Sequence, residues 1–499
     1  MNRRFNLVYE KWIPVTGNDL LSLQDVFANP SLVSIGGTPI QKIALTKFLL
    51  AIAHSAFTPN NHDEWESLKP EGLACRSREY LQKNQDEFWL YEPEHPFLQM
   101  PVISKAEKQS PGALSPIISS GNTTVLTQSQ IERPLSDSER ALLLVTLMGF
   151  ALGGKKTDNS VTLSPHYMGK KNEKQKPSTG KPGPFVGYMG YLHGFVNGST
   201  LHETLFLNLL TLKEIESFGV FTAGTGRPPW EDMPQGEACK RASELKNSYI
   251  GRLIPLSRFV LWADDGQIHY SEGISFPPYD KGGIDPSISI DQSGKKSKAL
   301  WTSPGKRPWR ELASMLSFLD SSRNNGFLCH FIKIGVGRAK EIKLPGFSIW
   351  VGGLRVSSNA GEQYASGTDD FVESEINLDT ASLGSVWLAT LEVELANLDA
   401  LSKTIYACTM AYYKALKDNN AEHASRACSI FWQLAEKNHQ ELICACSKDD
   451  ENRAALRSIF IGYANRVYDL VCPSDTARQL EAWAGNRPNF SKRKATKQK

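Results

Sequence analysis

The feature that most restricts the fold is a row of apolar residues near the end of the 499-residue chain, repeated at helical spacing. Its members are Leu391, Leu395, Leu398, Ile405, Tyr412 and Leu416. Steps of three and four residues, or sums of such steps, place side chains on one face of a helix. The row therefore predicts a long helix with one buried face. The change in composition near Leu378 predicts that a separate domain begins there.

Two further rows of the same kind follow. The first is formed by Ala424, Cys428, Phe431 and Ala435, and the second by Leu456, Ile459, Tyr463, Val467 and Leu470. Pro473 ends the third helix, and Ser474 is placed to cap a short fourth helix that runs through Trp483. Four helices with short connections predict an antiparallel four-helix bundle over residues 380–485.

The preceding part of the chain, residues 1–375, is typical of a mixed α/β domain, because short β-rich runs alternate with helical stretches and Gly/Pro turns. The expected helices cover residues 40–56, 138–152 and 200–212, and the expected strands include 259–262 and 347–351. We therefore predict an α+β fold, with a large mixed N-terminal domain followed by an all-α bundle. The basic residues 486–499 are expected to form a disordered tail.

Composition excludes some function classes. Lys and Arg number 56 against 53 Asp and Glu, so nucleic-acid binding would have to come from local basic patches. No apolar run is long enough to span a membrane, and none follows the charged start of the chain, so we expect neither a membrane span nor a signal peptide. The 8 cysteines form no C-x-x-C pair, which favours reduced thiols in a cytoplasmic protein.

Three basic segments break this neutral balance, and the last of them is the tail, for which we expect a non-specific polyelectrolyte role or none. Residues 155–181 hold seven lysines against two acidic residues, and the glycines around them would allow a close approach to phosphate; a solvated surface loop is the alternative. Residues 295–310 hold six basic residues, no acidic residue, and Trp301 and Trp309. Such a mixture suits a nucleic-acid backbone, and it equally suits core tryptophans with basic flanks. The candidate phosphate contacts are Lys170, Lys171, Lys306 and Arg307.

The chain shows no constellation typical of an enzyme. It lacks a Walker A loop, a G-x-S-x-G elbow and an H-E-x-x-H motif. The isolated pairs His62–Asp63, His202–Glu203 and Cys329–His330 are expected to be packed or surface residues. We therefore predict no catalytic residue, metal or cofactor. A neutral segment, residues 352–363, is either an exposed turn or an amide wedge that unstacks a duplex.

Two aromatic–proline strings lie near the start of the chain. Residues 6–15 read as an aromatic strand that stops at Pro14, which cannot donate to a sheet. Residues 94–100 read as a turn that sets Phe97 into a core, since a residue before proline is held extended.

In order and spacing these strings resemble the N-terminus of the CasA family, the large subunit of the type I-E CRISPR surveillance complex Cascade. The resemblance extends over most of the chain, through residues 199–212, 228–230, 352–353 and 425–436, and a strand pair formed by residues 251–262 and 301–309. It implies a non-catalytic subunit that recognises the protospacer-adjacent motif (PAM) of duplex DNA from the minor groove and helps to open the duplex.

The resemblance also implies site residues. A glycine loop would include Gly180, Lys181 and Gly183, a lysine finger would be Lys281, and a wedge would be Gln363, or Asn359 if the register shifts. Contacts to the RNA handle would be Asn122, Leu126 and Gln128, with Leu126 where the family has an aromatic residue. Some family members carry cysteines suited to zinc before the lysine finger; residues 264–274 have none, so we expect no zinc here.

The implied partners are the CRISPR RNA 5′ handle, double-stranded target DNA, the Cascade backbone and small subunits, and a separate helicase-nuclease, with no membrane. Two alternatives remain open. One is the large subunit of a different CRISPR effector with its own metal-dependent nuclease activity, and the other is a protein-only scaffold.

Overall fold

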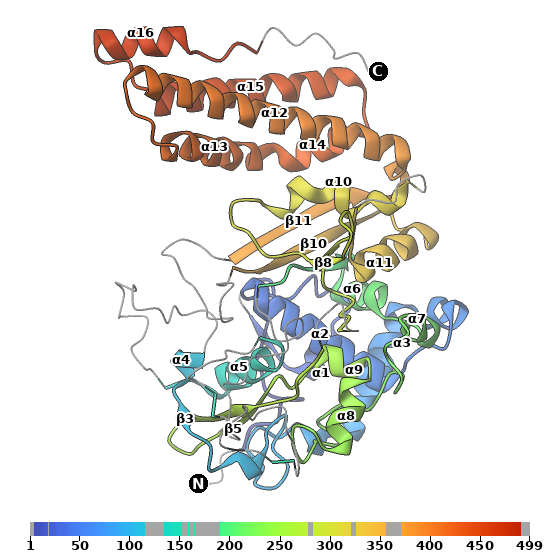
Figure 1. Cartoon of the computed structure of the whole chain (residues 1–499). Coiled ribbons are helices and arrows are strands. Elements are labelled where there is room, and N and C mark those ends of the chain that lie inside the picture. Colours follow the sequence, from blue (N-terminus) through green and yellow to red (C-terminus); the bar gives the residue numbers. More distant parts are fainter. Residues whose placement is uncertain are drawn as a thin grey trace. The chain divides into compact units, whose positions relative to one another are not determined.

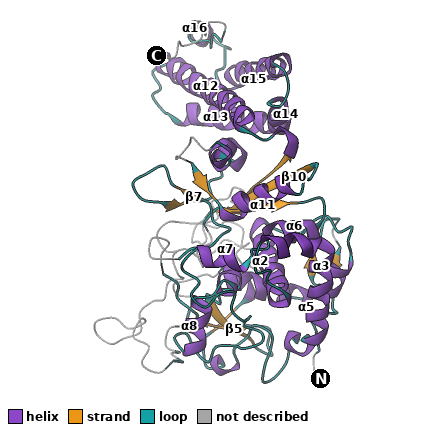
Figure 2. Cartoon of the chain, turned by 90° about the vertical axis from the view of Figure 1, so that its right-hand side faces the viewer, coloured by secondary structure: helices purple, strands orange, loops and turns teal. Residues whose placement is uncertain are grey.

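The computed structural model describes residues 4–17, 19–114, 134–150, 157–158, 161, 163–164, 190–277, 283–320, 326–355 and 371–490. Its secondary structure is a mixture of helices and strands (Figures 1 and 2). The chain divides into two compact units. The first comprises residues 1–308 and 325–375, and the second comprises residues 309–324 and 376–499. The sequence did not reveal that residues 309–324 belong with the C-terminal helices.

The first unit holds most of the described helices, and they range in length from 4 to 22 residues. They are α1 (Leu23–Ala28), α2 (Pro39–Ala56), α3 (His62–Lys83), α4 (Pro111–Leu114), α5 (Asp137–Gly149), α6 (Leu201–Asn208), α7 (Leu212–Ser217), α8 (Lys240–Lys246), α9 (Ile250–Leu253) and α11 (His330–Glu341). The helices expected over residues 40–56 and 138–152 correspond to α2 and α5. The helix expected over residues 200–212 is interrupted, because Thr211 caps α7 with Glu214 in a capping box.

Helix α2 lies at the centre of the first unit (Figure 1). It is apolar on nearly all sides, as expected for a helix surrounded by protein. An aromatic cluster packs beside it, in which the Phe48 and Trp230 rings lie 5.6 Å apart and the Phe88 and Phe97 rings 5.2 Å apart. Phe97 is buried, so the turn expected at residues 94–100 does place this ring in the core.

The strand expected over residues 6–15 is confirmed only at its end, at β1 (Ile13–Pro14). Residues 7–9 form a turn, since Asn6 Oδ1 accepts the backbone N–H of Val8. In β1, Pro14 pairs with Leu20 of β2 (Leu20–Leu21), and isolated β-bridges join Asn6 to Trp89 and Val15 to Ile35.

The chain also forms three small sheets. One has the order β11–β10–β4, with β4 (His193–Asn197), β10 (Gly346–Leu354) and β11 (Phe371–Asp379); α6 and α11 pack on β4. A second has the order β3–β6–β5, with β3 (Lys108–Gln109), β5 (Arg258–Trp262) and β6 (Ile268–Glu272). The third has the order β8–β7–β9, with β7 (Ile290–Asp291), β8 (Lys298–Ala299) and β9 (Phe327–Leu328).

The strands expected at residues 259–262 and 347–351 are confirmed as β5 and β10. The proposed pairing of residues 251–262 with residues 301–309 is wrong, because β5 pairs with β6 in antiparallel register, Arg258 opposite Glu272. A local hairpin across Gly266, whose φ of +82° suits glycine, supplies the neighbour that the resemblance assigned to a distant segment.

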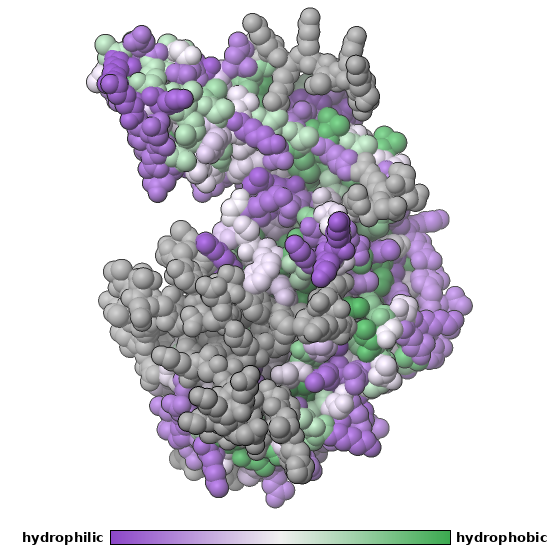
Figure 3. Space-filling view, in the orientation of Figure 1, coloured by the Kyte–Doolittle hydropathy of each residue, from purple (hydrophilic) through white to green (hydrophobic). Residues whose placement is uncertain are grey.

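The second unit is helical: α10 (Leu312–Met315), α12 (Ser385–Ala415), α13 (Glu422–Ala435), α14 (His439–Ala445), α15 (Asp450–Val471) and α16 (Ala477–Gly485). Helices α12, α13 and α15 pack on one another, and α16 packs on α12 (Figures 1 and 2). Apolar side chains expected on the inner faces of α12 and α13 are buried, including Leu391, Leu398 and Phe431. The outer surface around α16 is largely hydrophilic (Figure 3).

The inner face expected for α15 is partly wrong. Ile459 and Leu470 are 41% and 68% exposed, whereas Phe460, Ala464 and Tyr468 are buried. Leu456 and Val467 of the expected face are buried, so the inner face is shifted by one position only in part. The cap of α16 is Thr476 rather than Ser474, since Thr476 Oγ1 accepts the backbone N–H of Gln479.

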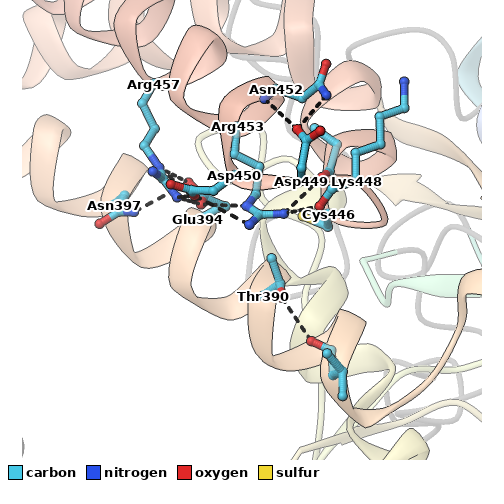
Figure 4. A network of polar contacts seen from close by, with 12 residues as sticks. Thr390, Glu394, Asn397, Cys446, Lys448, Asp449, Asp450, Asn452, Arg453 and Arg457 are labelled. Carbon is cyan, nitrogen blue, oxygen red and sulfur yellow. Dashed lines mark hydrogen bonds and ion pairs between the residues drawn. The ribbon is translucent and has the colours of Figure 1, made fainter.

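A buried carboxylate joins α12 to α15 (Figure 4). Glu394 of α12 is 2% exposed, and its Oε2 lies 3.0 Å from Nε of Arg457. Arg457 also donates to Asp450 at 2.9 Å, and Arg453 lies beside both carboxylates. One buried charge is therefore met by two guanidinium groups, which fixes the two helices in register.

No helix among the described residues is long and apolar enough to cross a membrane. Within the same residues, no group of three or more His, Cys, Asp or Glu side chains is arranged to hold a metal ion.

Candidate nucleic-acid interface

Most of the predicted contact residues lie outside the described residues, and two do not. Those outside are Asn122, Leu126, Gln128, Lys170, Lys171, Gly180, Lys181, Gly183, Lys281, Asn359 and Gln363. Lys306 is exposed and Arg307 is partly exposed in the first unit. The site is therefore built from the described residues at the ends of these segments.

Strand pairing brings two of these ends together. β4 and β10 are antiparallel, with His193 opposite Gly352. β4 therefore begins where β10 is about to end. The described residues resume at Gly190, just before β4, and stop at Arg355, just after β10. Segments 165–189 and 356–370 therefore join the fold at the same place, where β4 begins and β10 ends. We call this place the edge of the sheet.

The end of a third segment, residues 278–282, lies close to the same place. The residues that follow segment 278–282 run beside β4, where Gly194 N donates to Ser287 O at 2.8 Å and Ser289 N donates to Leu192 O at 2.9 Å. His193 also bridges Ile288. The three segments assigned to the glycine loop, the lysine finger and the wedge thus start or finish around the first residues of β4.

Buried polar groups hold this junction. Asp285 Oδ2 lies 2.6 Å from Nζ of Lys47 on α2, and the two side chains are 1% and 5% exposed. Asp285 Oδ1 accepts the hydroxyl and the backbone N–H of Ser287, and that hydroxyl lies 2.8 Å from Nδ1 of His193. Burial alone would raise the pKa of Asp285, but Lys47 and His193 lower it below its usual value. Asp285 therefore stays ionised at neutral pH.

Arg252 of α9 holds both sides of segment 278–282. Its Nε donates to the carbonyl of Ile284 at 2.9 Å, and its guanidinium lies 4.7 Å from the ring centroid of Phe276. Burial lowers the pKa of Arg252 to about 10, although Asp285 opposes the shift. The guanidinium remains charged, and the two ends of this segment are tied to one rigid helix.

The backbone at the end of β10 is closely covered. A Cβ added to Gly353 would lie 2.8 Å from the Tyr191 carbonyl oxygen and would also meet Thr302 Oγ1. Thr302 N in turn donates to the Gly190 carbonyl at 2.7 Å. A side chain at residue 353 would separate these strands, so the Gly352–Gly353 pair that carried part of the resemblance has a packing role.

The basic segment 295–310 begins on the β7–β8 hairpin. Residues 292–298 are exposed there, and Lys306 is exposed beyond the hairpin. The two tryptophans differ, since Trp309 is 1% exposed and Trp301 is 45% exposed. The core interpretation therefore applies to Trp309 and not to Trp301.

The isolated polar pairs are packed or at the surface. His202 is buried and its Nε2 lies 2.9 Å from the Val26 carbonyl oxygen. Cys329 is buried, and burial raises the pKa of its thiol to about 12. His62 Nε2 lies 3.0 Å from Glu341 at the surface.

Sequence reasoning missed the buried charges of the junction, Lys47, Arg252 and Asp285. Charged side chains are usually exposed, so their presence in an ordinary sequence indicates nothing about a core. Lys47 lies in a helix that also contains Lys42, and the sequence does not show which of the two lysines is buried.

The chain matches a known family over most of its length. The sequence model described as CRISPR-associated protein Cse1 matches residues 6–467. A CRISPR-associated protein CasA/Cse1 from Thermus thermophilus is 26% identical over 342 residues, which cover 63% of this chain. The match spans 60% of that relative's own length.

Solved structures share the fold. Thermus thermophilus CasA (Cse1) has a TM-score of 0.71 at 17% identity, covering 97% of this chain and 98% of that one. Thermobifida fusca Cse1 has a TM-score of 0.72 at 20% identity, covering 97% and 93%. A chain of a CRISPR RNA-guided surveillance complex has a TM-score of 0.65 at 14% identity, covering 97% and 99%. At these identities the likeness shows the fold alone.

Proposed function

Because the chain belongs to the CRISPR-associated Cse1 (CasA) family, we propose that it is the large, non-catalytic subunit of a cytoplasmic, RNA-guided Cascade complex. It recognises the PAM on duplex DNA, helps to open the duplex, and leaves the reading of sequence to guide pairing. The observation that carries this proposal is the meeting of three segment ends around the start of β4.

The same edge supports minor-groove reading. Lys281 lies in a segment whose two ends are tied to Arg252. The wedge, Gln363 or Asn359, is on the connection from β10 to β11, and Gly180, Lys181 and Gly183 lie on the segment that leads to β4. The minor-groove pattern is degenerate, so this reader accepts several motifs. Contacts to phosphates that do not depend on the base sequence are added by Lys170, Lys171, Lys306 and Arg307.

The remaining assignments concern partners. Asn122, Leu126 and Gln128 contact the 5′ handle of the CRISPR RNA. Helices α12, α13, α15 and α16 act as a four-helix bundle, which together with the first unit contacts the backbone and small subunits. A separate helicase-nuclease docks on this chain and supplies the cleavage activity.

Lys281→Ala and Gln363→Ala are each expected to weaken PAM-dependent duplex binding by about tenfold or more, since each removes a groove contact worth about 1–3 kcal/mol. The measurement is duplex affinity of the assembled complex, with assembly checked by size-exclusion chromatography. Lys240→Ala is the control, because Lys240 is 92% exposed and its loss changes the charge equally. Asn359→Ala decides the register of the wedge. Unchanged affinity in both the Lys281 and the Gln363 variants would contradict the assignments.

A further inference from the structure

Trp301 differs from every other tryptophan of the chain. All eleven are among the described residues, and ten of them are buried or partly buried. Trp301 alone is exposed, at 45%. Part of this large aromatic ring is therefore accessible at the surface, where its apolar face and its polar N–H can both be used.

The position of the ring is fixed by a neighbouring segment of the chain. Trp301 bridges Tyr191 in the backbone, and the two rings meet edge to face with centroids 5.7 Å apart. On either side, Leu192 N donates to Leu300 O and Thr302 N donates to Gly190 O. Trp301 is therefore a fixed aromatic surface at the edge where the three segment ends meet.

Cations precede and follow this position in the sequence. No acidic residue lies between Gln292 and Arg310. Lys295, Lys296 and Lys298 are exposed on the β7–β8 hairpin before Trp301, and Lys306 is exposed after it. Positive charge next to an exposed aromatic ring is the arrangement by which proteins hold single-stranded nucleic acid, with phosphates on the cations and a base on the ring.

We propose that Trp301 stacks on an unpaired nucleobase, while the hairpin lysines and Lys306 hold the adjoining phosphates. In a duplex both faces of each base are covered by its neighbours, so the ring has access only to a strand that has been opened. The inference rests on the proposed function, to which it adds a site for the separated strand. The shared chemistry is the unpaired base, in DNA or in RNA.

The test is the affinity of the full chain for single-stranded thymidine oligonucleotides of about 12 nucleotides, with an abasic oligonucleotide of the same length and charge as comparison. Trp301→Ala is expected to weaken binding to the thymidine strand by about 5- to 30-fold and to leave abasic binding unchanged. Trp301→Phe keeps a ring and is expected to retain most of the affinity. Tyr406→Ala, which removes an aromatic side chain 39% exposed on α12, is expected to have no effect.

Uridine oligonucleotides distinguish the two sources of the base, since tighter binding of one strand identifies DNA or RNA. Equal losses on thymidine and abasic strands, no loss with Trp301→Ala, or no binding of single strands by the wild-type chain would each overturn the inference. Loss of assembly with other subunits without loss of single-strand affinity would identify Trp301 as a protein contact instead. PAM-dependent duplex binding is measured separately, so the proposed function stands or fails on its own.

Discussion

Replacing Asp285 with alanine is expected to lower the free energy of unfolding by about 3–5 kcal/mol, because the substitution leaves the Lys47 ammonium buried without its carboxylate. The two side chains are 1% and 5% exposed, so water cannot replace the lost partner. The variant also removes the acceptor for the backbone N–H and hydroxyl of Ser287. Urea unfolding of the full chain, followed by tryptophan fluorescence, measures the loss.

Asp265→Ala is the matched control for this prediction. Asp265 Oδ2 lies 2.7 Å from Lys108 Nζ, and its Oδ1 accepts the backbone N–H two residues on, from Gln267, as Asp285 does from Ser287. The difference is exposure, since the Asp265 and Lys108 side chains are 50% and 39% exposed. The expected cost there is below about 1 kcal/mol. Similar losses for the two variants would contradict the role given to the buried pair.

Lowering the pH is expected to destabilise the first unit, and the loss of stability begins near pH 6.5, above the pH range in which carboxylates titrate. Burial lowers the pKa of His54 to about 3, with a further contribution from Arg338, and burial lowers that of His193 to about 3 against the attraction of Asp285. Burial and Lys333 lower the pKa of His330 to about 4. Below pH 6.5, the ordinary pKa of histidine, these side chains bind protons in the unfolded chain but remain neutral in the folded chain. Stability therefore falls as the pH falls from 6.5 towards the folded pKa values, by about 1.4 kcal/mol per pH unit for each buried histidine.

His54→Leu isolates one of these contributions. The His54 ring lies 4.9 Å from that of Tyr249, edge to face, and its Nε2 has no hydrogen-bond partner. The apolar side chain removes the titrating group, so the slope of unfolding free energy against pH between about 6 and 4 is expected to decrease by about 1.4 kcal/mol per unit. Asp285 does not obscure the result, because its lowered pKa means that its contribution is lost only below about 3.8. An unchanged slope would show that His54 titrates normally in the folded chain.

Local patterns in the sequence predicted the elements well where one face had to be buried. The apolar faces of α12 and α13 are buried at the expected positions, and α2 and α5 lie within a few residues of their expected bounds. The pattern was only partly right for α15. Leu456 and Val467 are buried as expected, but Phe460 rather than Ile459 is buried, since both are apolar and only tertiary packing distinguishes them.

Pairing between strands and the placement of buried charge were beyond local reasoning. The partner of β5 is a neighbour across a tight turn, and no periodicity distinguishes that choice from a distant strand. Asp285 and Arg252 look like surface residues in the sequence, yet they fix the junction on which the candidate interface depends. The resemblance named contact residues, while the structure supplies the edge on which their segments meet.

The most direct test of the central claim is duplex binding by the guide-RNA complex, assembled with and without this chain, on targets with and without candidate PAMs. The account predicts that PAM-dependent binding requires the chain and that binding to targets without a PAM changes little when it is added. Equal binding and equal PAM preference without the chain would contradict the recognition role and leave this protein as a scaffold or as a different kind of effector.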